Sequence, residues 1–561
     1  MPSPVHRLPS PPLAEGCVRE ALVETRPRGN QLLEWKSPCA AILVLILLSV
    51  VVVLSGTVSL HRPLWMDEVH SWILITDVDA AHSLRALSDG ADYNPPVYFL
   101  FARMLDLLPG GVTEFSLRLL SAGIMTTAIV FTCLTLMRSF SPGTSLIAVI
   151  PIAAHPLVVD QFAEVRFYPL WCLLTVALAY LLTGSSFSGG RVRSGQIRRA
   201  GFLSSSQRTV LLTVSTGCLA SLTTGVHYFG IISVMLVIGG YLASGSPKLQ
   251  WKIAAVVAVA SLGTLGLCLP VLFGQRAAVT RPTWISPPTV EMTIDYLKAV
   301  TPLVAIVFFL VMGVIGRAMR WHIPVAGSST GPAADCDTPV PCDSEDLLRC
   351  QLPLLSLTAM PLAITVLSWT LQPAMVTRYS IVGCFGYAPL LAWLIHNATP
   401  RLRLIAALGA LILAWSGFQA GSDRIAHAEQ LQRTIEQEVL CLPGNALVFF
   451  EDRIHWLPLV HQYPEFADRC RLMTFRDDQL AQDSSLRIVQ RDVARRIEKW
   501  YPQFQTAALE DLDDLRDFYV VPYAGGTERD LAYPAGFGVV RISKHVLRFK
   551  KSPSRIPMDR P

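Results

Sequence analysis

Long runs of apolar residues without charge recur through the first three quarters of the chain. The first of them, residues 40–60, contains no Asp, Glu, Lys or Arg. A helix needs about 20 such residues to cross the hydrocarbon core of a bilayer. The run lies too far from the first residue, and continues too long, for a cleaved signal peptide. The sequence therefore predicts a membrane-spanning helix here.

Ten further runs have the same apolar character over windows of about 19 residues. They lie at 118–137, 144–159, 167–183, 209–226, 229–244, 253–273, 300–316, 353–371, 380–396 and 404–419. Together the runs predict a polytopic α-helical membrane domain of about eleven transmembrane helices over residues 38–419. A tail of residues 1–37 precedes it.

The last part of the chain has a different composition. Of the 47 Lys and Arg and the 42 Asp and Glu in the chain, 20 and 21 lie in residues 420–561. Periodicity there indicates strands at 446–450, 471–475 and 518–523 and a helix at 485–500. We therefore expect a soluble α/β domain over 420–561. Its two cysteines, Cys441 and Cys470, could pair if the domain lies outside the reducing cytosol.

Basic residues in the short loops orient the helices, because cytoplasmic loops are enriched in Lys and Arg. With the N-terminal tail inside, the basic residues of four other loops also fall on the cytoplasmic side. These are Arg191, Arg193, Arg198, Arg199 and Arg208; Lys248 and Lys252; Arg317 and Arg320; and Arg401 and Arg403. The C-terminal domain is then extracytoplasmic, as are the loops 61–117, 160–166 and 372–379. We expect a multi-pass protein of the inner or plasma membrane.

The formal net charge of +5 is small, and no basic cluster with interleaved aromatic residues accompanies it. A protein that follows nucleic acid phosphates needs such a cluster on one face. Nucleic acid is therefore excluded as a partner. The inner loop 321–350 is rich in Gly, Pro, Ser and Asp and indicates a flexible insertion.

The first outer loop contains an apolar segment at 95–108 that also carries Arg103 and Asp106. About fourteen residues are too few to span a bilayer, so we expect an amphipathic helix at the membrane surface. Pro95 and Pro96 suit its beginning, since proline is tolerated in the first helical turn.

An acidic pair, Asp67 and Glu68, directly follows the first predicted span, between Trp65 and Trp72. A carboxylate at this level could accept a proton from an incoming hydroxyl or help to bind a divalent cation. An ordinary pair of solvated loop charges is the alternative interpretation.

A second polar group, Glu164, Arg166 and Tyr168, lies between the third and fourth spans. In an extended turn these alternate residues project together, and the guanidinium of Arg166 matches phosphate oxygens. The alternative is a salt bridge between Glu164 and Arg166 that anchors the beginning of a helix. Asp160 is a further carboxylate of the same outer turn. Arg118 could contact a lipid phosphate, although an arginine at a helix end more often snorkels to the interface.

Several short motifs occur in one order along residues 40–420. They are WMDE at 65–68, YNPPVYFLFA at 93–102, RLLS at 118–121, EVRFY at 164–168, VHYFG at 226–230 and RY at 378–379. This order resembles the GT-C glycosyltransferases, in particular the protein O-mannosyltransferase and lipid A aminoarabinose transferase branch and similar bacterial transferases. Two positions depart from the pattern: Asn94 replaces a histidine, and Phe167 replaces a proline.

The resemblance implies transfer of a sugar from a polyprenyl-phosphate carrier to a hydroxyl acceptor on the extracytoplasmic side, by an inverting single displacement. Asp67 corresponds to the acidic residue proposed as catalytic base or metal ligand, with Glu68 beside it. The motifs place the donor phosphate near Arg166, Tyr168, Arg378 and Tyr379 and make Asp160, Glu164 and His227 candidates for binding a metal or a substrate. A divalent metal cation is the candidate cofactor. For His227 alone, packing is the alternative role.

Three other functions are compatible with a many-helix chain. A ligase that transfers a whole oligosaccharide is the alternative within the enzyme class. A secondary transporter would show paired broken helices in two repeated halves, and no internal repeat is found here. A membrane scaffold would leave Asp67, Glu164 and Arg166 as incidental loop charges. The sugar, the carrier length, the acceptor and the oligomeric state stay open at this level.

Overall fold

The computed structural model describes residues 64–162, 164–186, 204–245, 247–277, 285, 287–321, 344–474, 485–512, 514–522 and 537–551. The predicted N-terminal tail 1–37 and first span 40–60 lie outside the described residues. Most of the predicted inner insertion 321–350 does so as well.

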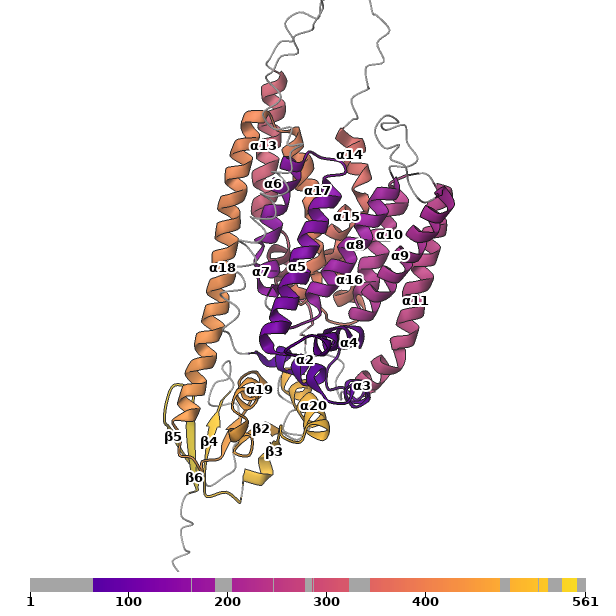
Figure 1. Cartoon of the computed structure of the whole chain (residues 1–561). Helices are drawn as coiled ribbons and strands as arrows, with labels where there is room; N and C mark the ends of the chain where they lie inside the picture. The colour runs from indigo at the N-terminus through magenta and orange to yellow at the C-terminus, as the bar shows by residue number, and fades with distance from the viewer. Residues whose placement is uncertain are drawn as a thin grey trace, which may run out of the picture.

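Each of the ten apolar runs after residue 100 coincides with helix. The helices are α5 Glu114–Leu136, α6 Pro142–Ala153, α7 Pro156–Gln161, α8 Tyr168–Ser186, α9 Ser205–Val226, α10 Gly230–Ala243, α11 Pro247–Ala277, α13 Leu303–Trp321, α15 Leu352–Leu355, α16 Met360–Thr370, α17 Ile381–Asn397 and α18 Pro400–Leu440. A further short helix, α14 Ser344–Cys350, lies at the end of the predicted inner insertion. They stand roughly alongside one another in a bundle, with α18 on one flank (Figure 1).

Among the described residues, six helices are long and apolar enough to cross a membrane. The number is seven if α12, Val290–Val300, and the start of α13, which meet at a bend of 63°, form one span. Three shorter apolar helices, α6, α8 and α10, accompany them. The predicted total of eleven transmembrane helices therefore stays a prediction.

The predicted span at 144–159 is divided into two helices. α6 ends at Ala153, and α7 begins after His155, whose Nδ1 accepts the N–H of Leu157 at 3.3 Å. Pro156 occupies the first turn of α7, where its missing N–H costs little. The capping side chain of His155 and the following proline thus begin a new helix. An average of hydropathy over a window of residues does not detect such a break.

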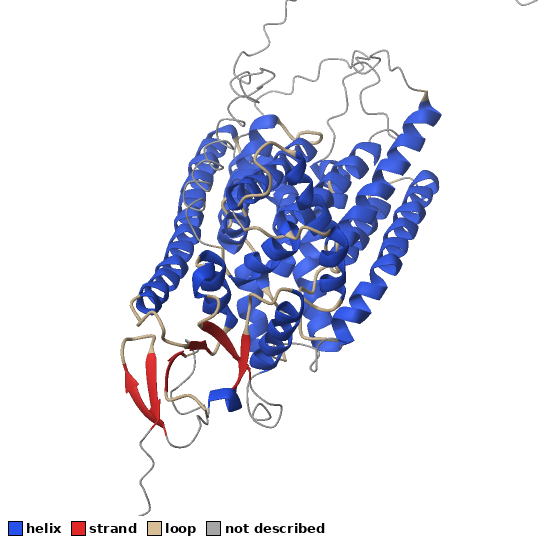
Figure 2. Cartoon of the chain, turned by 60° about the horizontal axis from the view of Figure 1, so that its bottom comes forward, coloured by secondary structure: helices blue, strands red, loops and turns tan. Residues whose placement is uncertain are grey.

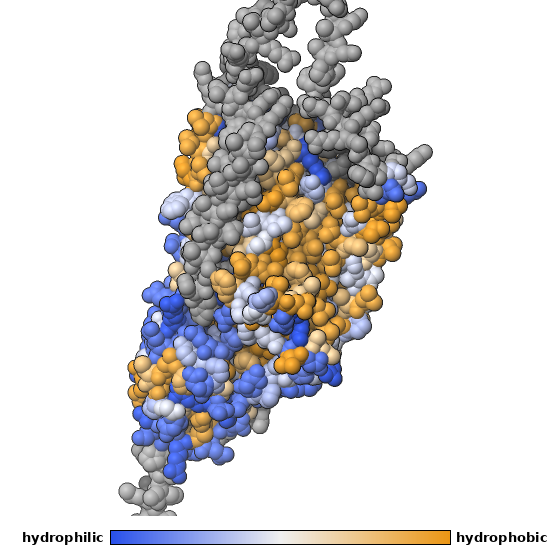
Figure 3. Space-filling model, in the orientation of Figure 1, coloured by the Kyte–Doolittle hydropathy of each residue, from blue (hydrophilic) through white to orange (hydrophobic). Residues whose placement is uncertain are grey.

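The outer surface of the bundle is apolar, as expected for contact with lipid. Large hydrophobic side chains are exposed along α11, including Val259 and Leu267, and along α13, including Val304. Figure 3 shows this apolar surface over the helices and a mostly hydrophilic surface over the C-terminal domain. In soluble proteins such a large exposed apolar area is rare.

Short helices close the end of the bundle that faces the C-terminal domain (Figure 1). They are α2 Met66–Thr76, α3 Ala80–Ser88 and α4 Val97–Arg103, and α4 continues into the 3₁₀ turn η2 Met104–Leu107. The helix expected over 95–108 is therefore present, with Pro96 as its N-cap residue. Its position at a membrane surface stays a prediction.

The C-terminal domain is built on a six-stranded sheet in the order β3-β2-β1-β4-β6-β5. Its strands are β1 Val448–Phe450, β2 Cys470–Thr474, β3 Thr506–Ala508, β4 Asp517–Val521, β5 Phe537–Arg541 and β6 Leu547–Lys551. β1, β2, β3 and β4 pair in parallel, whereas β6 joins β4 and β5 antiparallel. Figure 2 shows these strands beyond the end of the helical bundle.

The α/β prediction for this domain is confirmed in class and in three of its strands. β1, β2 and β4 coincide with the predicted runs, and α20, Ser485–Trp500, with the predicted helix. The pattern did not reveal β3, β5, β6 or α19, Arg453–Gln462. Cys441 is exposed after α18 and Cys470 is buried in β2; both are free thiols, so they do not pair.

Charged side chains hold the C-terminal domain against the short helices. Asp89, which follows α3, accepts bonds from Arg496 at 3.0 Å, Lys499 at 2.6 Å and Trp500 at 2.8 Å. The hydroxyl of Tyr501 donates to Asp77 at 2.8 Å. The domain is also continuous with the bundle through α18, which has no break at the predicted boundary of 419 and 420.

Candidate functional site

The acidic pair lies in the first turn of α2. The N–H of Trp65 donates to Oε2 of Glu68 at 3.0 Å, which satisfies a donor at the beginning of the helix. Negative charge is favourable there, because the helix dipole is positive at this end. Asp67 is 8% exposed and Glu68 is fully buried. The interpretation of these residues as a solvated loop pair is therefore wrong.

Glu68 joins three segments of the chain. Its Oε1 lies 3.4 Å from Nη1 of Arg118 in α5 and accepts the N–H of Val165 at 2.8 Å. Arg118 is 2% exposed, so its snorkelling interpretation is wrong: the side chain points into the protein. Through these bonds Glu68 holds α2, α5 and the segment before α8 together.

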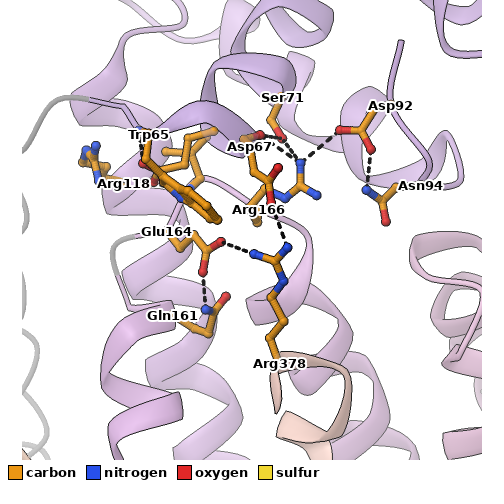
Figure 4. A network of polar contacts seen from close by, with 12 residues as sticks. Trp65, Asp67, Ser71, Asp92, Asn94, Arg118, Gln161, Glu164, Arg166 and Arg378 are labelled. Carbon is orange, nitrogen blue, oxygen red and sulfur yellow. Dashed lines mark hydrogen bonds and ion pairs between the residues drawn. The ribbon is translucent and has the colours of Figure 1, made fainter. Parts of the chain in front are cut away.

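Asp67 forms an ion pair with Arg378, which lies in the 3₁₀ turn η5, Thr377–Ser380. Nη2 of Arg378 donates to Oδ2 of Asp67 at 2.8 Å, and its Nη1 lies 3.9 Å from Oε1 of Glu164. Gln161 donates to the other oxygen of Glu164. Figure 4 shows Arg378 pointing up between the two carboxylates. α2, the segment before α8 and the late Arg-Tyr motif thus meet at one point.

Arg166 approaches the same turn of α2 from another direction (Figure 4). Its Nη1 donates to the carbonyl oxygen of Asp67 at 2.9 Å, to Oδ2 of Asp92 at 3.0 Å and to Oγ of Ser71 at 3.3 Å. Arg166 therefore pairs with Asp92, not with Glu164 as its spacing suggested. Asp92 was not identified from the sequence; its position two residues before Asn94, which donates to it at 2.5 Å, was the available signal.

His227 lies in a cluster of rings beside this network. Its ring stacks on Phe167 with centroids 4.6 Å apart and lies 5.5 Å from the ring of Tyr379. Burial, together with the charges of Arg166 and Arg378, lowers the pKa of His227 to about 3. His227 is therefore neutral at physiological pH, and its aromatic contacts are those of a packing residue.

Tyr168 also belongs to the ring cluster and borders the cation. Its ring centroid lies 6.1 Å from that of His227 and 5.8 Å from the guanidinium carbon of Arg378. Trp65 lies at a comparable 5.4 Å from the same carbon. Aromatic faces at these distances stabilise a positive charge, so Tyr168 and Trp65 help to hold Arg378 in position.

Asp160 has a different environment from the other candidates. Its Oδ2 accepts a bond from Nη1 of Arg424 in α18 at 2.9 Å, which ties α7 to α18. Among the described residues, no group of three or more His, Cys, Asp and Glu side chains is arranged to hold a metal ion. These residues thus give no ligand set for the divalent cation considered from the sequence.

The charges of the network keep Asp67 ionised. Burial alone would raise the pKa of Asp67, but the positive charges of Arg378, Arg166 and Arg453 outweigh burial and hold it well below its usual range. Burial likewise opposes the charge of Arg166, whereas Asp92 and Asp67 raise the pKa of its guanidinium. The site therefore contains a carboxylate that stays charged beside guanidinium groups suited to phosphate oxygens.

No family model and no curated protein matches the sequence. The fold does match solved structures. ArnT from Cupriavidus metallidurans bound to undecaprenyl phosphate superimposes with a TM-score of 0.56 at 12% identity, over 92% of this chain and 99% of that chain. The same protein in the apo state gives 0.55 at 11% identity, over 91% and 98%. The archaeal oligosaccharyltransferase AglB from Archaeoglobus fulgidus matches at 0.43 and 11% identity, over 76% and 64%.

The match to ArnT covers nearly the whole of both chains, so it extends into the C-terminal domain. It confirms the fold that the sequence motifs suggested, because the chain shares the fold of ArnT, with a helical bundle and a C-terminal domain.

Proposed function

We propose that this chain, which has the GT-C fold, is a glycosyltransferase that moves a sugar from a polyprenyl-phosphate donor to a hydroxyl acceptor. The observation that carries the proposal is the buried pair of Asp67 and Arg378, with Arg166 beside it. A carboxylate and two guanidinium groups meet there in a fold shared with a protein that was crystallised with undecaprenyl phosphate.

The donor's phosphate is the leaving group, and negative charge develops on it as the bond to the sugar breaks. Arg378 could stabilise that charge, since charge-assisted bonds from a guanidinium suit phosphate oxygens. Tyr168 and Tyr379 line the same region through the ring cluster. A donor placed here would have its lipid tail among the apolar helices.

The acceptor's hydroxyl must lose a proton as it attacks the sugar carbon. Asp67 is the proposed base, although its low pKa makes it a weak base while Arg378 is bound to it. A phosphate that draws Arg378 toward itself would remove this charge from Asp67 and so raise the pKa of the carboxyl group. Donor binding would then activate the base. Attack opposite the leaving phosphate inverts the sugar centre.

The remaining candidates have supporting parts in this proposal. Glu164 shares Arg378 with Asp67 and could contact a sugar hydroxyl. Glu68 positions the first turn of α2 through Arg118 and Val165. His227 contributes a neutral ring to the aromatic wall. Asp160, paired with Arg424, is better suited to fixing α18 than to binding a metal, and the mechanism has no step through a cation.

The distribution of Lys and Arg supports an extracytoplasmic site and C-terminal domain. The acceptor is a hydroxyl of a lipid, a glycan or a protein.

Incubation of the purified protein with a labelled polyprenyl-phosphate sugar and a cell-envelope extract tests the proposal. A new glycoside that carries one sugar, formed by the wild type and not by Asp67→Asn, is the expected result. Products enlarged by a whole oligosaccharide would identify a ligase instead. If no glycosidic product forms with any donor, the proposal is wrong and a transporter or a scaffold becomes the better interpretation.

A further inference from the structure

Arg453 is a buried arginine of the C-terminal domain with an unusual lack of partners. It is the first residue of α19 and is 8% exposed. Among the described residues, its Nε and Nη1 atoms make no hydrogen bond. Buried polar atoms are nearly always bonded, and a buried charge without a partner is costly. A ligand that accepts hydrogen bonds from these two nitrogens would remove that cost.

The position of Arg453 is fixed by local structure and by docking of the domain. Asp452 caps α19 by accepting the N–H of His455 at 3.0 Å. α19 packs against α2, the helix that carries Asp67 (Figure 1). Farther along α19, His461 bonds to Glu114 of α5 at 3.0 Å. α19 is therefore held against α2 and, near its end, against the beginning of α5.

Other buried donors without partners lie in the same region. Nε2 of His70, in α2, and the hydroxyl of Tyr93, in the loop before α4, make no hydrogen bond among the described residues. α19 packs against α2, and the charge of Arg453 acts on Asp67, His70 and Tyr93, so the four groups lie within electrostatic range of one another. Burial, followed by the charge of Arg453, holds the pKa of His70 well below its usual value, and burial raises that of Tyr93. Both are thus neutral hydrogen-bonding groups beside one cation.

The two arginines identified from the sequence also have a buried Nε without a hydrogen bond among the described residues, but unlike Arg453 each is paired with a carboxylate. Arg166 is bonded to Asp92 at 3.0 Å, and Arg378 to Asp67 at 2.8 Å. A phosphate would have to compete with these carboxylates. Arg453 instead presents two nitrogens that already lack partners, and the partial positive charge at the beginning of α19 adds to its own.

We propose that Arg453 binds the phosphate group of the lipid-linked donor, so that the C-terminal domain contributes a residue to the active site. The inference rests on the proposed function. The planar guanidinium matches two phosphate oxygens, and the unpartnered groups of His70 and Tyr93 can donate to the remaining oxygens or to the sugar.

The position of Arg453 beside Asp67 favours the donor's phosphate over a more distant anion. In a single displacement, the acceptor attacks the same sugar carbon that the phosphate leaves. The base and the phosphate are then separated by little more than that carbon and its bonds. Arg453 acts electrostatically on Asp67 without forming an ion pair with it, which fits this separation.

Binding of undecaprenyl phosphate to the full-length protein tests the inference directly. The variants are Arg453→Gln and Arg453→Lys, and Arg433→Gln is the control because Arg433 is an exposed arginine of α18 paired with Glu429. Undecaprenol, which lacks the phosphate, and inorganic phosphate are the comparison probes. We expect Arg453→Gln to weaken binding of the lipid phosphate by about 10- to 100-fold, as for loss of a charged hydrogen-bonding pair. Binding of undecaprenol should not change.

Equal affinity of wild type and Arg453→Gln for the lipid phosphate would overturn the inference. So would an equal loss of undecaprenol binding, which would indicate a general defect. If Arg453→Gln does not fold, Arg453→Lys is tested instead. The ammonium group of lysine is a point charge that cannot bond two phosphate oxygens as a guanidinium does, so we expect about tenfold weaker binding of the lipid phosphate. Unchanged affinity would refute the proposal. Tight binding of inorganic phosphate that depends on Arg453 would assign the site to free phosphate instead.

Transfer assays separate this inference from the proposed function. If the wild type transfers sugar and Arg453→Gln has an unchanged KM for the donor, the inference fails while the function stands. A KM raised only for the acceptor also overturns the assignment to the donor. If no transfer is found but phosphate binding depends on Arg453, the function fails and the binding site stands.

Discussion

Asp67 and Arg378 are 311 residues apart in the sequence and form a buried ion pair of 2.8 Å. The pair joins α2 to the turn before α17, and Glu164 adds the segment before α8. Three predicted outer segments therefore converge at the end of the bundle that faces the C-terminal domain. The predictions below test what this convergence does.

Replacement of Asp67 by Asn should reduce sugar transfer by about 100-fold or more, which is the usual contribution of a positioned base. Membrane insertion should persist, because Asn occupies nearly the same volume. Initial rates with a labelled donor give the effect, and Asp106→Asn, at an exposed acid of the same predicted outer loop, is the matched control. Retained activity would remove Asp67 from the mechanism.

Replacement of Arg378 by Gln should move the acid limb of the pH–rate profile to higher pH. Arg378 is the strongest of the charges that lower the pKa of Asp67. Without it, the carboxyl group binds a proton at higher pH, and the base is lost earlier on acidification. Rates measured between pH 4 and 8 with the donor well below its KM, which report the pKa of the free enzyme, show the shift. An unmoved limb would contradict the assignment of Asp67 as the base.

Docking of the C-terminal domain should weaken in acid through Asp89. Burial raises the pKa of Asp89, but its bonds to Lys499 and Trp500 and the charge of Arg496 leave it below the usual value. A lowered pKa in the folded state means that the stabilisation is present above the pKa of the unfolded chain, about 4, and is lost as the pH falls further. Limited proteolysis of the domain at pH 7 and pH 3.5 measures docking. Asp89→Asn should make the domain sensitive to the protease at both pH values. The control is Asp295→Asn, which changes a distant exposed acid.

Replacement of Glu68 by Gln should destabilise the folded protein by about 3–5 kcal/mol, since it leaves Arg118 buried without its carboxylate. Unfolding in mild detergent measures the loss. The double change of Glu68→Gln with Arg118→Met should recover much of it, because the buried positive charge that Glu68 balances is then absent as well. Equal instability of the single and double variants would show that the Glu68–Arg118 pair is not the cause.

Replacement of Gly417 by Ala should disturb packing of α18 on the bundle. A Cβ atom at this position would lie 2.2 Å from the carbonyl oxygen of Ala154, so the helices must separate. The matched variant is Gly123→Ala in α5, where a Cβ would meet nothing within 4 Å. Thermal unfolding should show a lower midpoint for the first variant alone, because overpacking costs about 1–3 kcal/mol. Equal midpoints would contradict the close contact.

Local sequence was sufficient for much of the fold. The long apolar runs marked the helices, because a helix in lipid must be apolar along its whole length. Alternating β-rich runs marked β1, β2 and β4. The same reasoning missed β3, β5, β6 and α19, since short elements owe their conformation to neighbours that lie far away in the sequence.

The residues of the site were also partly visible in the sequence. Asp67, Glu164, Arg166 and Arg378 stood out as polar groups on one predicted side of the membrane. Their pairing did not follow: Arg166 bonds to Asp92, and Arg378 bonds to Asp67.

What the sequence determined by itself was the helical, apolar character of the bundle and the presence of a separate α/β domain, because hydropathy and charge act residue by residue. The tertiary structure alone decided which carboxylate meets which guanidinium, and it alone brought Arg453 from the C-terminal domain to Asp67. Ion pairs and buried donors depend on distances of a few ångströms, and those distances are set by packing between segments hundreds of residues apart.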